Sequence, residues 1–328
     1  MPTNLPPDYF EVEKQFRQAT LPEEKIACLE EMLAIVPKHK GTDHLRADLR
    51  RRLSKLKAAA ETRGKTGRQG SAYHIDREGA GQVVLVGVAN VGKSALVAEL
   101  TNADPEVAEY PLTTWIPTPG MMPIEDIQVQ LIDTPPLNPD FMEPELLNLI
   151  RRADLVLLLV DLQGYPMQEL EDTVSLLEAQ HIMPLRRRDE YVGEVPMTFV
   201  PMQVLVTKCD DEDLDGEFEV LSELLGGEWA LIPVSAKTGH HVDEFKRRVF
   251  DALDIVRVYS KPPGEEPDLS APFVIHKGAT VQELAGKVHK DFLEQLKSAR
   301  VWGSATHDGQ MVGRDHVLQD GDIVELRL

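Results

Sequence analysis

Apolar residues in the middle of the chain form short continuous runs, a pattern typical of strands buried on both faces of a sheet. These runs alternate with segments in which apolar residues recur every three or four positions, as on helices packed against such a sheet. The alternation predicts an α/β fold with a doubly wound, mostly parallel sheet. We expect strands at 83–86, 129–132, 155–160, 204–206 and 230–234, and helices at 94–100, 167–179, 217–225 and 242–253.

The chain on either side of this sheet follows other patterns. Between residues 7 and 60, apolar residues recur at helical spacing in two stretches, which predicts an N-terminal helical region. After the Pro- and Gly-rich stretch YSKPPGEEP, the apolar segments predict a small strand–helix–strand–strand module. The segment 183–196 fits no period and is expected to be a surface loop. The predicted domains are a helical region with a basic linker at 1–70, the α/β domain at 71–258, a linker at 259–270 and a C-terminal domain at 271–328.

Composition narrows the classes of function. The chain has 328 residues, of which 42% are hydrophobic and 27% charged, as in an ordinary globular protein. Its net charge of −20 disfavours broad, non-specific adhesion to nucleic acid or to an anionic membrane. The longest apolar run, LVLLLV, is far shorter than the ~20 residues of a membrane helix. The N-terminus shows no signal-peptide pattern, and the two cysteines, Cys28 and Cys209, are too far apart for metal-ligand spacing. We therefore expect a cytoplasmic protein with neither a membrane nor a DNA partner.

One segment departs from this acidic balance. Between residues 38 and 68 the chain carries eleven basic residues against three acidic ones. Such a cluster could contact the phosphates of ribosomal RNA, with salt-sensitive binding. Alternatively, it is a solvated helix face that pairs with the acidic α/β domain. The basic residues are Lys38, Lys40, Arg46, Arg50, Arg51, Arg52, Lys55, Lys57, Arg63, Lys65 and Arg68.

The segment GVANVGKS, at 87–94, follows a predicted strand and opens a predicted helix. It matches the pattern G-x-x-x-x-G-K-[ST] of a phosphate-binding loop, in which successive main-chain N–H groups point at phosphate oxygens. The positive end of the following helix adds to the attraction. Lys93 would reach the terminal phosphates, and Ser94 would bind Mg²⁺. The nucleotide contacts of this loop are expected from Gly87, Asn90, Val91, Gly92, Lys93, Ser94 and Ala95.

Further motifs follow in the order that a guanine-nucleotide domain requires. The threonine pair in YPLTTW, Thr113-Thr114, would bring a hydroxyl to Mg²⁺ from a mobile loop. Asp133 ends an apolar strand and would hold Mg²⁺ through water. Each motif alone also fits a plain structural role, as a surface element or a turn. Their joint order and spacing favour binding of GTP and GDP with Mg²⁺.

Two short motifs point to guanine rather than adenine. In TKCD, the carboxylate of Asp210 can accept two hydrogen bonds from the N1 and N2 edge of guanine, which adenine lacks, and Lys208 would lie along the base. In SAK, main-chain N–H groups would close over the base oxygen. An adenine-nucleotide enzyme is therefore the disfavoured alternative. The expected base contacts are Thr207, Lys208, Asp210, Ser235, Ala236 and Lys237.

The tracts TNADPEVAEYPLTTWIPTPGMM and QLIDTPP resemble those of the Obg family of P-loop GTPases, and within it the developmentally regulated GTP-binding (DRG) branch. The tract from PFVIHKGATVQEL to QDGDIVEL resembles a TGS domain, a ubiquitin-like β-grasp module, and the N-terminal tract EEKIACLEEMLAIVPKHKGTDHLRADLRRRLSKLK resembles the helical start of DRG-like proteins. The resemblance implies GTP binding and hydrolysis, a role linked to the ribosome or structured RNA, and a partner protein as a further candidate. It makes Thr114 the switch threonine, with Lys93 and Asn90 as the other catalytic residues, and Ser94, Thr114 and Asp133 as the Mg²⁺ set. TKCD departs from the commoner NKxD at Thr207.

The chain also departs from the family pattern DTPG, because it reads DTPP. Pro136 has no N–H to contact the γ-phosphate. A hydrogen bond to a charged group contributes roughly 1.5–3 kcal/mol, so GTP should be preferred over GDP less than in a relative with glycine. Leu137 stands where many GTPases place a water-orienting glutamine, and we interpret it as an apolar anchor. Asn90 would help to bind K⁺ in place of an arginine finger, or would only stabilise the loop.

Together these features predict a slow GTPase switch linked to the ribosome or RNA. The alternative is a guanine-nucleotide-binding scaffold or sensor with negligible hydrolysis, which Pro136 and Leu137 favour. On the C-terminal module, a further set could form an RNA-facing surface, although Trp302 fits core packing better. This set is His276, Lys277, Lys287, His289, Lys290, Lys297 and Trp302.

Overall fold

The structure, a computed structural model, describes residues 75–101, 117–137, 142–225, 227–305 and 307–327, together with six N-terminal positions. The basic segment 38–68 and Thr113-Thr114 lie outside the described residues, as does most of the predicted N-terminal helical region. Among the six N-terminal positions, Leu29, Met32 and Val36 are buried. None of the helices in the described part of the chain combines the length and apolar character needed to cross a membrane.

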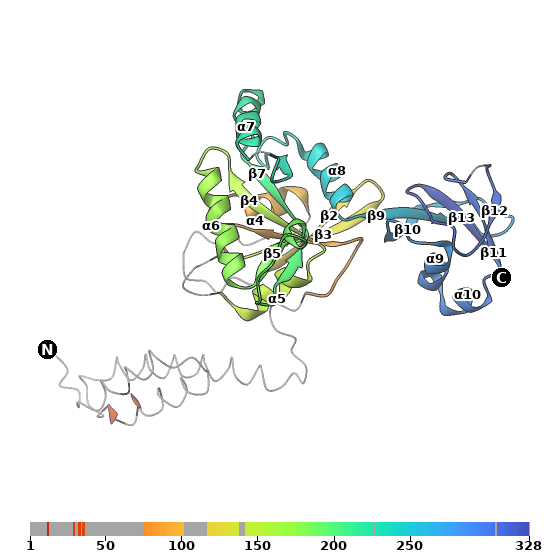
Figure 1. Ribbon diagram of the computed structural model, residues 1–328, viewed down its shortest axis with the longest axis horizontal. Coiled ribbons are helices and arrows are strands. Elements are labelled where there is room, and N and C mark those ends of the chain that lie inside the picture. The colour runs from red at the N-terminus through yellow and green to blue at the C-terminus, as the bar shows by residue number, and fades with distance from the viewer. Residues whose placement is uncertain are drawn as a thin grey trace. The chain divides into compact units, whose positions relative to one another are not determined.

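Six strands form the central sheet, in the order β2-β3-β1-β4-β7-β8 (Figure 1). All neighbours run parallel except β2, which pairs with β3 in an antiparallel hairpin. The predicted α/β fold with a mostly parallel sheet is therefore confirmed. The strands are β1 (Gln82–Val86), β2 (Thr118–Ile124), β3 (Ile127–Asp133), β4 (Leu155–Asp161), β7 (Met202–Thr207) and β8 (Leu231–Pro233).

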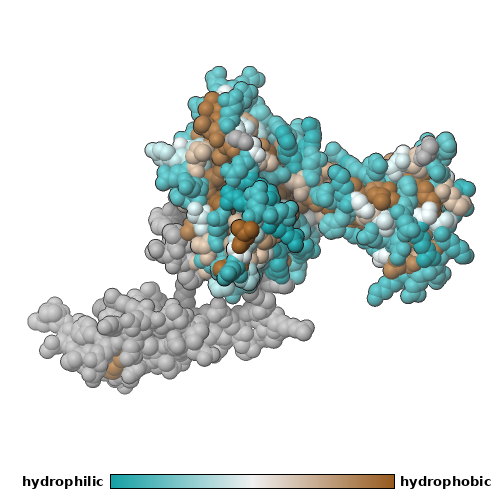
Figure 2. Space-filling model, viewed as in Figure 1, coloured by the Kyte–Doolittle hydropathy of each residue, from teal (hydrophilic) through white to brown (hydrophobic). Residues whose placement is uncertain are grey.

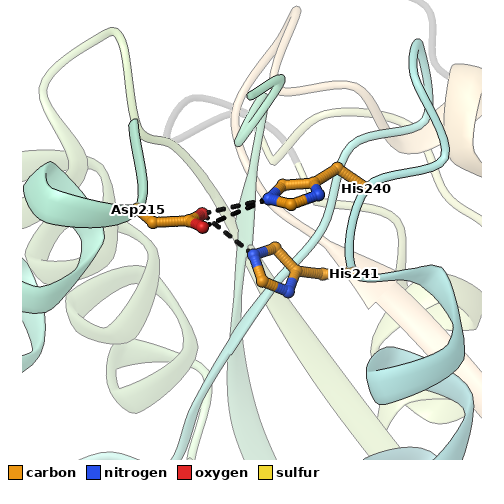
Figure 3. Close-up of side chains that lie close together, drawn as sticks. All are labelled: Asp215, His240 and His241. Atoms are coloured by element: carbon orange, nitrogen blue, oxygen red, sulfur yellow. Dashed lines mark hydrogen bonds and ion pairs between the residues drawn. The ribbon is translucent and has the colours of Figure 1, made fainter. Parts of the chain in front are cut away.

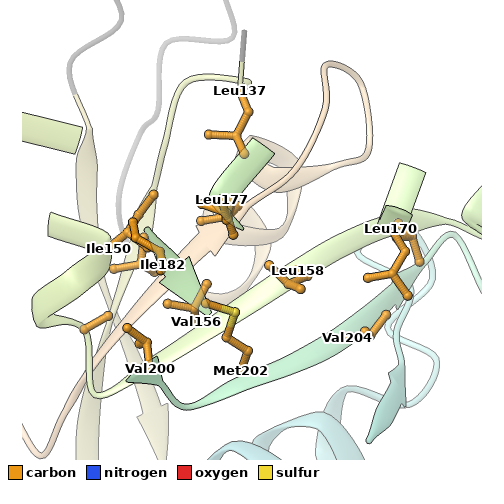
Figure 4. Packing of buried hydrophobic residues seen from close by; sticks show 14 of the residues in the cluster. Leu137, Ile150, Val156, Leu158, Leu170, Leu177, Ile182, Val200, Met202 and Val204 are labelled. Carbon is orange, nitrogen blue, oxygen red and sulfur yellow. The ribbon is translucent and has the colours of Figure 1, made fainter. Parts of the chain in front are cut away.

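Helices cover both faces of this sheet, so alternate strand residues enter two different apolar clusters. In β1, Val84 and Val86 belong to the cluster that α5, α6 and α7 cover (Figure 4), whereas Val83 and Leu85 face α4 and α8. Burial on both faces explains why the central strands read as unbroken apolar runs. The helices are α4 (Lys93–Leu100), α5 (Pro144–Arg152), α6 (Pro166–Ala179), α7 (Glu212–Leu224) and α8 (Val242–Ala252).

Some elements differ from the sequence-based expectation for local reasons. β2 was not predicted, because Pro119, Gly120 and Pro123 argue against a strand; β2 lies at the sheet edge, where proline is tolerated. Helix α7 begins at Glu212 rather than at 217, since the Asp211 carboxylate accepts hydrogen bonds from two main-chain N–H groups of its first turn. Helix α5 was also missed; it begins with a proline at a position where helices accept one.

The segment 183–196, expected to be a surface loop, begins with ordered structure. β5 (Ile182–Pro184) pairs in parallel with β6 (Thr198–Val200), and a short 3₁₀ helix (Leu185–Arg187) follows β5. The guanidinium of Arg186 lies 3.7 Å from the ring centroid of Trp229. Arg187 pairs with Glu178 and Glu228 at 2.8 and 2.7 Å. These contacts join residues that are distant in sequence, so no periodic pattern in the sequence predicts them.

A second, five-stranded sheet forms the C-terminal part, in the order β10-β9-β13-β11-β12, with an apolar cluster of its own. Its β9 (Ile255–Ser260) overlaps the predicted linker at 259–270, because only the stretch after Ser260 has linker composition. Helix α9 opens with a capping box between Thr280 and Glu283. The other elements are β10 (Asp268–His276), α9 (Val281–Val288), α10 (Lys290–Gln295), β11 (Ser298–Trp302), β12 (Gln310–Val312) and β13 (Asp322–Arg327).

The side chain of Arg257, in β9, connects the two sheets. Its Nη1 lies 2.8 Å from Asp126 Oδ1 in the β2–β3 turn, and it also pairs with Glu125 in that turn. Its Nε and Nη2 bind the two carboxylate oxygens of Asp320, which precedes β13, at 3.1 and 2.8 Å. The Tyr259 hydroxyl donates to the same Asp126. Arg257 is therefore shared between the β2–β3 turn of the central sheet and the C-terminal sheet.

Candidate nucleotide-binding site

The carboxyl ends of the parallel strands bring the predicted motifs to one edge of the central sheet. β1, β3, β7 and β8 all point the same way. The loop after β1 carries GVANVGKS, β3 ends at Asp133, and TKCD and SAK follow β7 and β8. Open parallel sheets bind ligands at this edge. Motifs that are distant in sequence thus meet in one place.

Backbone conformation curls the phosphate-binding loop. Asn90 has a φ of 66° and Gly92 a φ of 92°, both in the left-handed region, which glycine and asparagine enter most readily. A Cβ on Gly87 would stand 2.8 Å from the carbonyl oxygen of Leu159 in β4, so only glycine fits there. Asn90 is exposed, Val91 is buried, and Ala95 is exposed in the first turn of α4.

Lys93 folds back into this loop. It is only 4% exposed, and its Nζ donates to the carbonyl oxygens of Gly87 and Val88 at 2.9 and 2.7 Å. Burial lowers the pKa of Lys93 to about 8, against the opposing effect of the nearby Asp133 carboxylate. The ammonium group is thus held inside the loop by uncharged acceptors, at the position where the motif predicts phosphate oxygens.

Ser94 and Asp133 form the centre of the predicted Mg²⁺ site. The Ser94 hydroxyl donates to Asp133 Oδ2 at 2.6 Å, while Asp133 Oδ1 is buried with no hydrogen-bond partner among the described residues. Burial raises the pKa of Asp133, and the Ser94 and Lys93 contacts lower it in part. Mg²⁺ prefers such hard oxygen ligands, and an orphaned buried carboxylate oxygen is costly without a cation. The residues present therefore fit a magnesium ion.

The segment after Asp133 offers few N–H donors to a ligand. Pro135 and Pro136 have none, and the N–H of Leu137 points to the carbonyl oxygen of Gly87 at 3.4 Å. The Leu137 side chain is buried in the apolar cluster under α5 and α6, which confirms its interpretation as an apolar anchor (Figure 4). The Thr134 hydroxyl is also engaged, donating to the carbonyl oxygen of Leu85 at 2.6 Å.

The two guanine motifs are tied together through Asp210. The Ser235 hydroxyl donates to Asp210 Oδ1 at 2.7 Å, and Lys237 Nζ lies 3.3 Å from Oδ2. The Thr238 hydroxyl donates to the main-chain oxygen of Asp210 at 2.9 Å. The side chain of Ser235 also accepts from the N–H groups of Lys237 and Thr238 at 3.2 and 3.1 Å. The carboxylate is thereby fixed in one orientation, with half-buried Ala236 beside it.

Lys208 is positioned from β4. It has a φ of 61°, and its Nζ pairs with Asp161 at the end of that strand. The Gln163 side chain donates to the main-chain oxygen of Lys208 at 3.0 Å. Sequence reasoning missed Asp161, Gln163 and Thr238 as supports of the site. A carboxylate at the end of a buried strand was the only signal that could have marked Asp161.

The predicted RNA-facing residues of the C-terminal module are distributed over several elements. His276 ends β10, Lys287 lies in α9 and donates to the Val274 carbonyl, and Lys290 begins α10. The expectation that Trp302 packs in the core was wrong: it is half-buried beside Gly309 and lies outside the apolar cluster of this module. Lys261 Nζ lies 5.7 Å from its ring centroid. The surface facing the viewer in Figure 2 is mostly hydrophilic, and the exposed apolar residues include Val220 and Leu224 of α7.

Comparisons with known proteins agree with this geometry. A family model described as 50S ribosome-binding GTPase matches residues 82–187, and a TGS domain model matches 256–327. A GTP-binding protein of Methanocaldococcus jannaschii, described as uncharacterized, is 30% identical, with 93% of this chain and 92% of the relative covered. Developmentally-regulated G-protein 3 of Arabidopsis thaliana is 27% identical, over 92% of this chain and 98% of its own.

The fold also agrees with that of a solved structure. The structure of the Schizosaccharomyces pombe YchF GTPase superposes with a TM-score of 0.52, covering 77% of this chain and 99% of the other. The two sequences are 14% identical, so this match speaks for the fold alone. It agrees with a P-loop GTPase sheet followed by a β-grasp TGS domain.

Proposed function

This chain belongs to the family of DRG-type GTP-binding proteins, with a GTPase domain and a TGS domain, and from that premise we propose a slow, ribosome-linked GTPase switch. It would bind GTP and GDP with Mg²⁺ and hydrolyse GTP to GDP and phosphate. The observation that carries the proposal is the contact between Ser94 and Asp133 beside the curled loop, with a buried carboxylate oxygen left over for a cation.

In this proposal the phosphates lie in the loop 87–95. Lys93 would exchange its carbonyl partners for phosphate oxygens, which are charged and therefore stronger acceptors. Ser94 and Asp133 would hold Mg²⁺, with Thr114 joining them from its loop. Bound Mg²⁺ would neutralise charge on the phosphates, and catalysis of phosphoryl transfer consists mostly of such neutralisation and positioning.

The guanine base would be read by Asp210, whose carboxylate Ser235 and Lys237 already orient. Because this carboxylate is oriented before the base binds, less conformational entropy is lost on binding. Lys208 would lie along the base, and the SAK main chain would cover the base oxygen. Thr207 would act indirectly, through its hydrogen bond to Val91 in the phosphate loop.

We infer slow hydrolysis and a weak preference for GTP from the segment 135–137. Neither proline has an N–H for the γ-phosphate, and Leu137 turns its N–H to Gly87 and its side chain to the core. Charge compensation would then come from K⁺ bound with the help of Asn90. The same observation favours a second candidate, a guanine-nucleotide-binding scaffold or sensor that scarcely hydrolyses GTP.

The test is GTP turnover by the purified full-length protein with Mg²⁺, in potassium and sodium salts of matched ionic strength. We expect turnover that is faster in potassium, and a loss of this difference in Asn90→Ala. Lys93→Ala serves as the inactive blank. Equal rates in the two salts would contradict the K⁺ proposal. If GDP binds but no GTP is hydrolysed, even with ribosomes added, the protein is a guanine-nucleotide-binding scaffold or sensor and not a GTPase.

The ribosome link is supported by the description of the matched GTPase model and is tested by co-sedimentation with ribosomes. We expect binding that weakens steeply with salt if the basic segment 38–68 contacts RNA phosphates. A variant with Arg50, Arg51 and Arg52 changed to glutamine should then bind less, with GDP affinity unchanged. Such a role implies a cytoplasmic protein, and pull-down with and without RNase distinguishes structured RNA from a partner protein.

A further inference from the structure

Three side chains with metal-binding atoms converge in the segments that follow the guanine motifs TKCD and SAK. Asp215 comes from α7, and His240 and His241 come from the loop that leads into α8 (Figure 3). His240 Nε2 lies 3.2 and 3.3 Å from the two Asp215 oxygens, and His241 Nε2 lies 2.9 Å from Oδ1. One ligand atom from each residue falls within 4.8 Å of the others. Two imidazoles and a carboxylate are thus gathered at one point.

An unusual backbone conformation brings the two histidines to the same side. Neighbouring side chains in extended chain point apart, but His241 has a φ of 61°, in the left-handed region. The two rings consequently lie 3.9 Å apart between centroids, tilted by 50°. A non-glycine residue in that region is strained, and the surrounding contacts must offset this strain.

A second carboxylate lies on the other side of the His241 ring. His241 Nδ1 lies 3.5 Å from Glu244 Oε2 on its other side, so both ring nitrogens of His241 face carboxylates. A neutral imidazole carries only one N–H, so one of these carboxylates would meet a lone pair.

A metal ion would accept that lone pair. His241 would donate its Nδ1–H to Glu244 and turn the lone pair of Nε2 to the metal, the orientation that outer carboxylates impose on metal-bound histidines. We propose that Asp215, His240 and His241 bind a transition-metal ion of the Zn²⁺ class, with the remaining coordination positions open to water. Imidazole nitrogens with one carboxylate suit Zn²⁺, Co²⁺ or Ni²⁺, whereas Mg²⁺ prefers oxygen ligands alone. The side chains are 23% to 36% exposed, so an ion can reach them from solvent.

The ion would join the two segments that carry the guanine motifs. Asp215 lies in α7, which begins two residues after Asp210, and the His240 main-chain oxygen accepts from the Ser235 N–H at 3.0 Å. A metal bridge from α7 to the β8–α8 loop would therefore hold Asp210 and Ser235 in register. This second step rests on the proposed guanine role of Asp210, and it predicts tighter GDP binding when the metal is present.

The first test is calorimetric titration of Zn²⁺ into tag-free, full-length protein in excess Mg²⁺ and GDP, checked by the visible absorption of Co²⁺. We expect one strong site per chain, weakened about a hundredfold or more in the double variant His240→Gln/His241→Gln and in Asp215→Asn. The matched control replaces two exposed histidines elsewhere, His276→Gln/His307→Gln, and should bind as the wild type does. Glu244→Gln should weaken the site about tenfold, as outer ligands do.

Two results would overturn the site: no strong Zn²⁺ binding to the wild type, or undiminished binding to the double variant. Circular dichroism of the metal-free variants guards against a folding defect. The bridge is tested separately, by GDP affinity before and after a chelator that prefers zinc to magnesium. Unchanged GDP affinity with an intact zinc site would discard the bridge alone. Absent GDP binding would count against the proposed function and leave the zinc titration valid.

Discussion

The hydroxyl of Thr207 lies 2.7 Å from the main-chain oxygen of Val91, and 3.0 Å from that of Val160. Thr207 is buried at the end of β7, so one side chain connects the guanine motif to the phosphate loop and to β4. A hydroxyl has one proton for these two acceptors, whereas the amide of asparagine has two. The threonine in TKCD therefore makes this link with a single donor.

Removing that hydroxyl tests the link. Thr207→Val keeps the shape of the side chain but leaves the Val91 oxygen without its donor, at a cost of about 1–3 kcal/mol. We expect a lower melting temperature and weaker GDP binding. Thr207→Ser retains the donor and should stay close to the wild type, and Thr207→Asn should bind GDP at least as tightly. A valine variant indistinguishable from the wild type would mean that the contact is incidental.

Changing Asp210 tests the base assignment. Asp210→Asn loses a charged acceptor for the guanine N1 and N2 groups, and each such bond contributes roughly 1.5–3 kcal/mol. GDP affinity should fall at least tenfold. The new amide can donate to the oxygen that xanthine carries in place of the guanine amino group, so xanthosine diphosphate should gain affinity. Fluorescent-nucleotide competition measures both, and parallel loss of the two ligands would contradict the assignment.

Restoring an N–H at position 136 tests the altered switch. Pro136→Gly and Pro136→Ala both supply this group, and only the first adds glycine flexibility. If the N–H reaches the γ-phosphate, each variant should raise the affinity of a non-hydrolysable GTP analogue relative to GDP by about ten- to a hundredfold. The neighbouring change Pro135→Ala is the control. A gain confined to Pro136→Gly would point to chain flexibility instead of a hydrogen bond.

The carboxylates around Arg257 predict a dependence of stability on acid. Burial alone would raise the pKa of Asp126, but hydrogen bonds from Tyr259 and Arg257 hold that pKa below its usual range. Burial likewise opposes, and the hydrogen bonds of Arg257 cause, a lowered pKa of Asp320. Groups with lowered folded-state pKa values stabilise the protein above their unfolded pKa, near pH 4. That contribution disappears as the pH falls through the lowered folded values.

Arg257→Gln should therefore lower the melting temperature at pH 7 and flatten its decline below pH 4. The lost hydrogen bonds to charged groups correspond to about 1–3 kcal/mol at neutral pH. Arg300→Gln, in β11, changes the same charge in the C-terminal sheet without these carboxylates and should shift the curve less. Identical slopes for wild type and Arg257→Gln between pH 5 and 2 would refute the assignment.

The sequence predicted most of what depends on local spacing. The phosphate loop, Asp133, TKCD and SAK follow strands whose apolar runs are visible, and parallel pairing then brings their ends together. It could not predict the contacts that fix their orientation, such as Ser235 to Asp210 or Lys208 to Asp161, because these join side chains distant in sequence. Thr114 and the basic segment stay predictions.

The missed elements have physical reasons as well. β2 carries two prolines and a glycine that only an edge strand accepts, and β9 alternates polar Arg257 and Tyr259 with apolar residues beside a proline-rich stretch. The convergence of His240 and His241 on Asp215 depends on one positive φ, which no residue pattern marks. The periodicity of a sequence predicts which residues are buried, but it does not predict polar contacts between residues that are distant in sequence.

The position of β9 determines how the protein can be divided. Only two residues separate this strand from α8, and the strand lies between β10 and β13. The C-terminal sheet therefore begins almost where the last helix of the GTPase domain ends. Cleavage after residue 258, the predicted boundary, would leave residues 255–258 of the strand on the first fragment and 259–260 on the second. In the C-terminal fragment the edge of β13 that pairs with β9 would lose most of its partner, and such an unpaired edge favours aggregation. A fragment of residues 255–328 keeps all five strands of the C-terminal sheet and is the one to express alone.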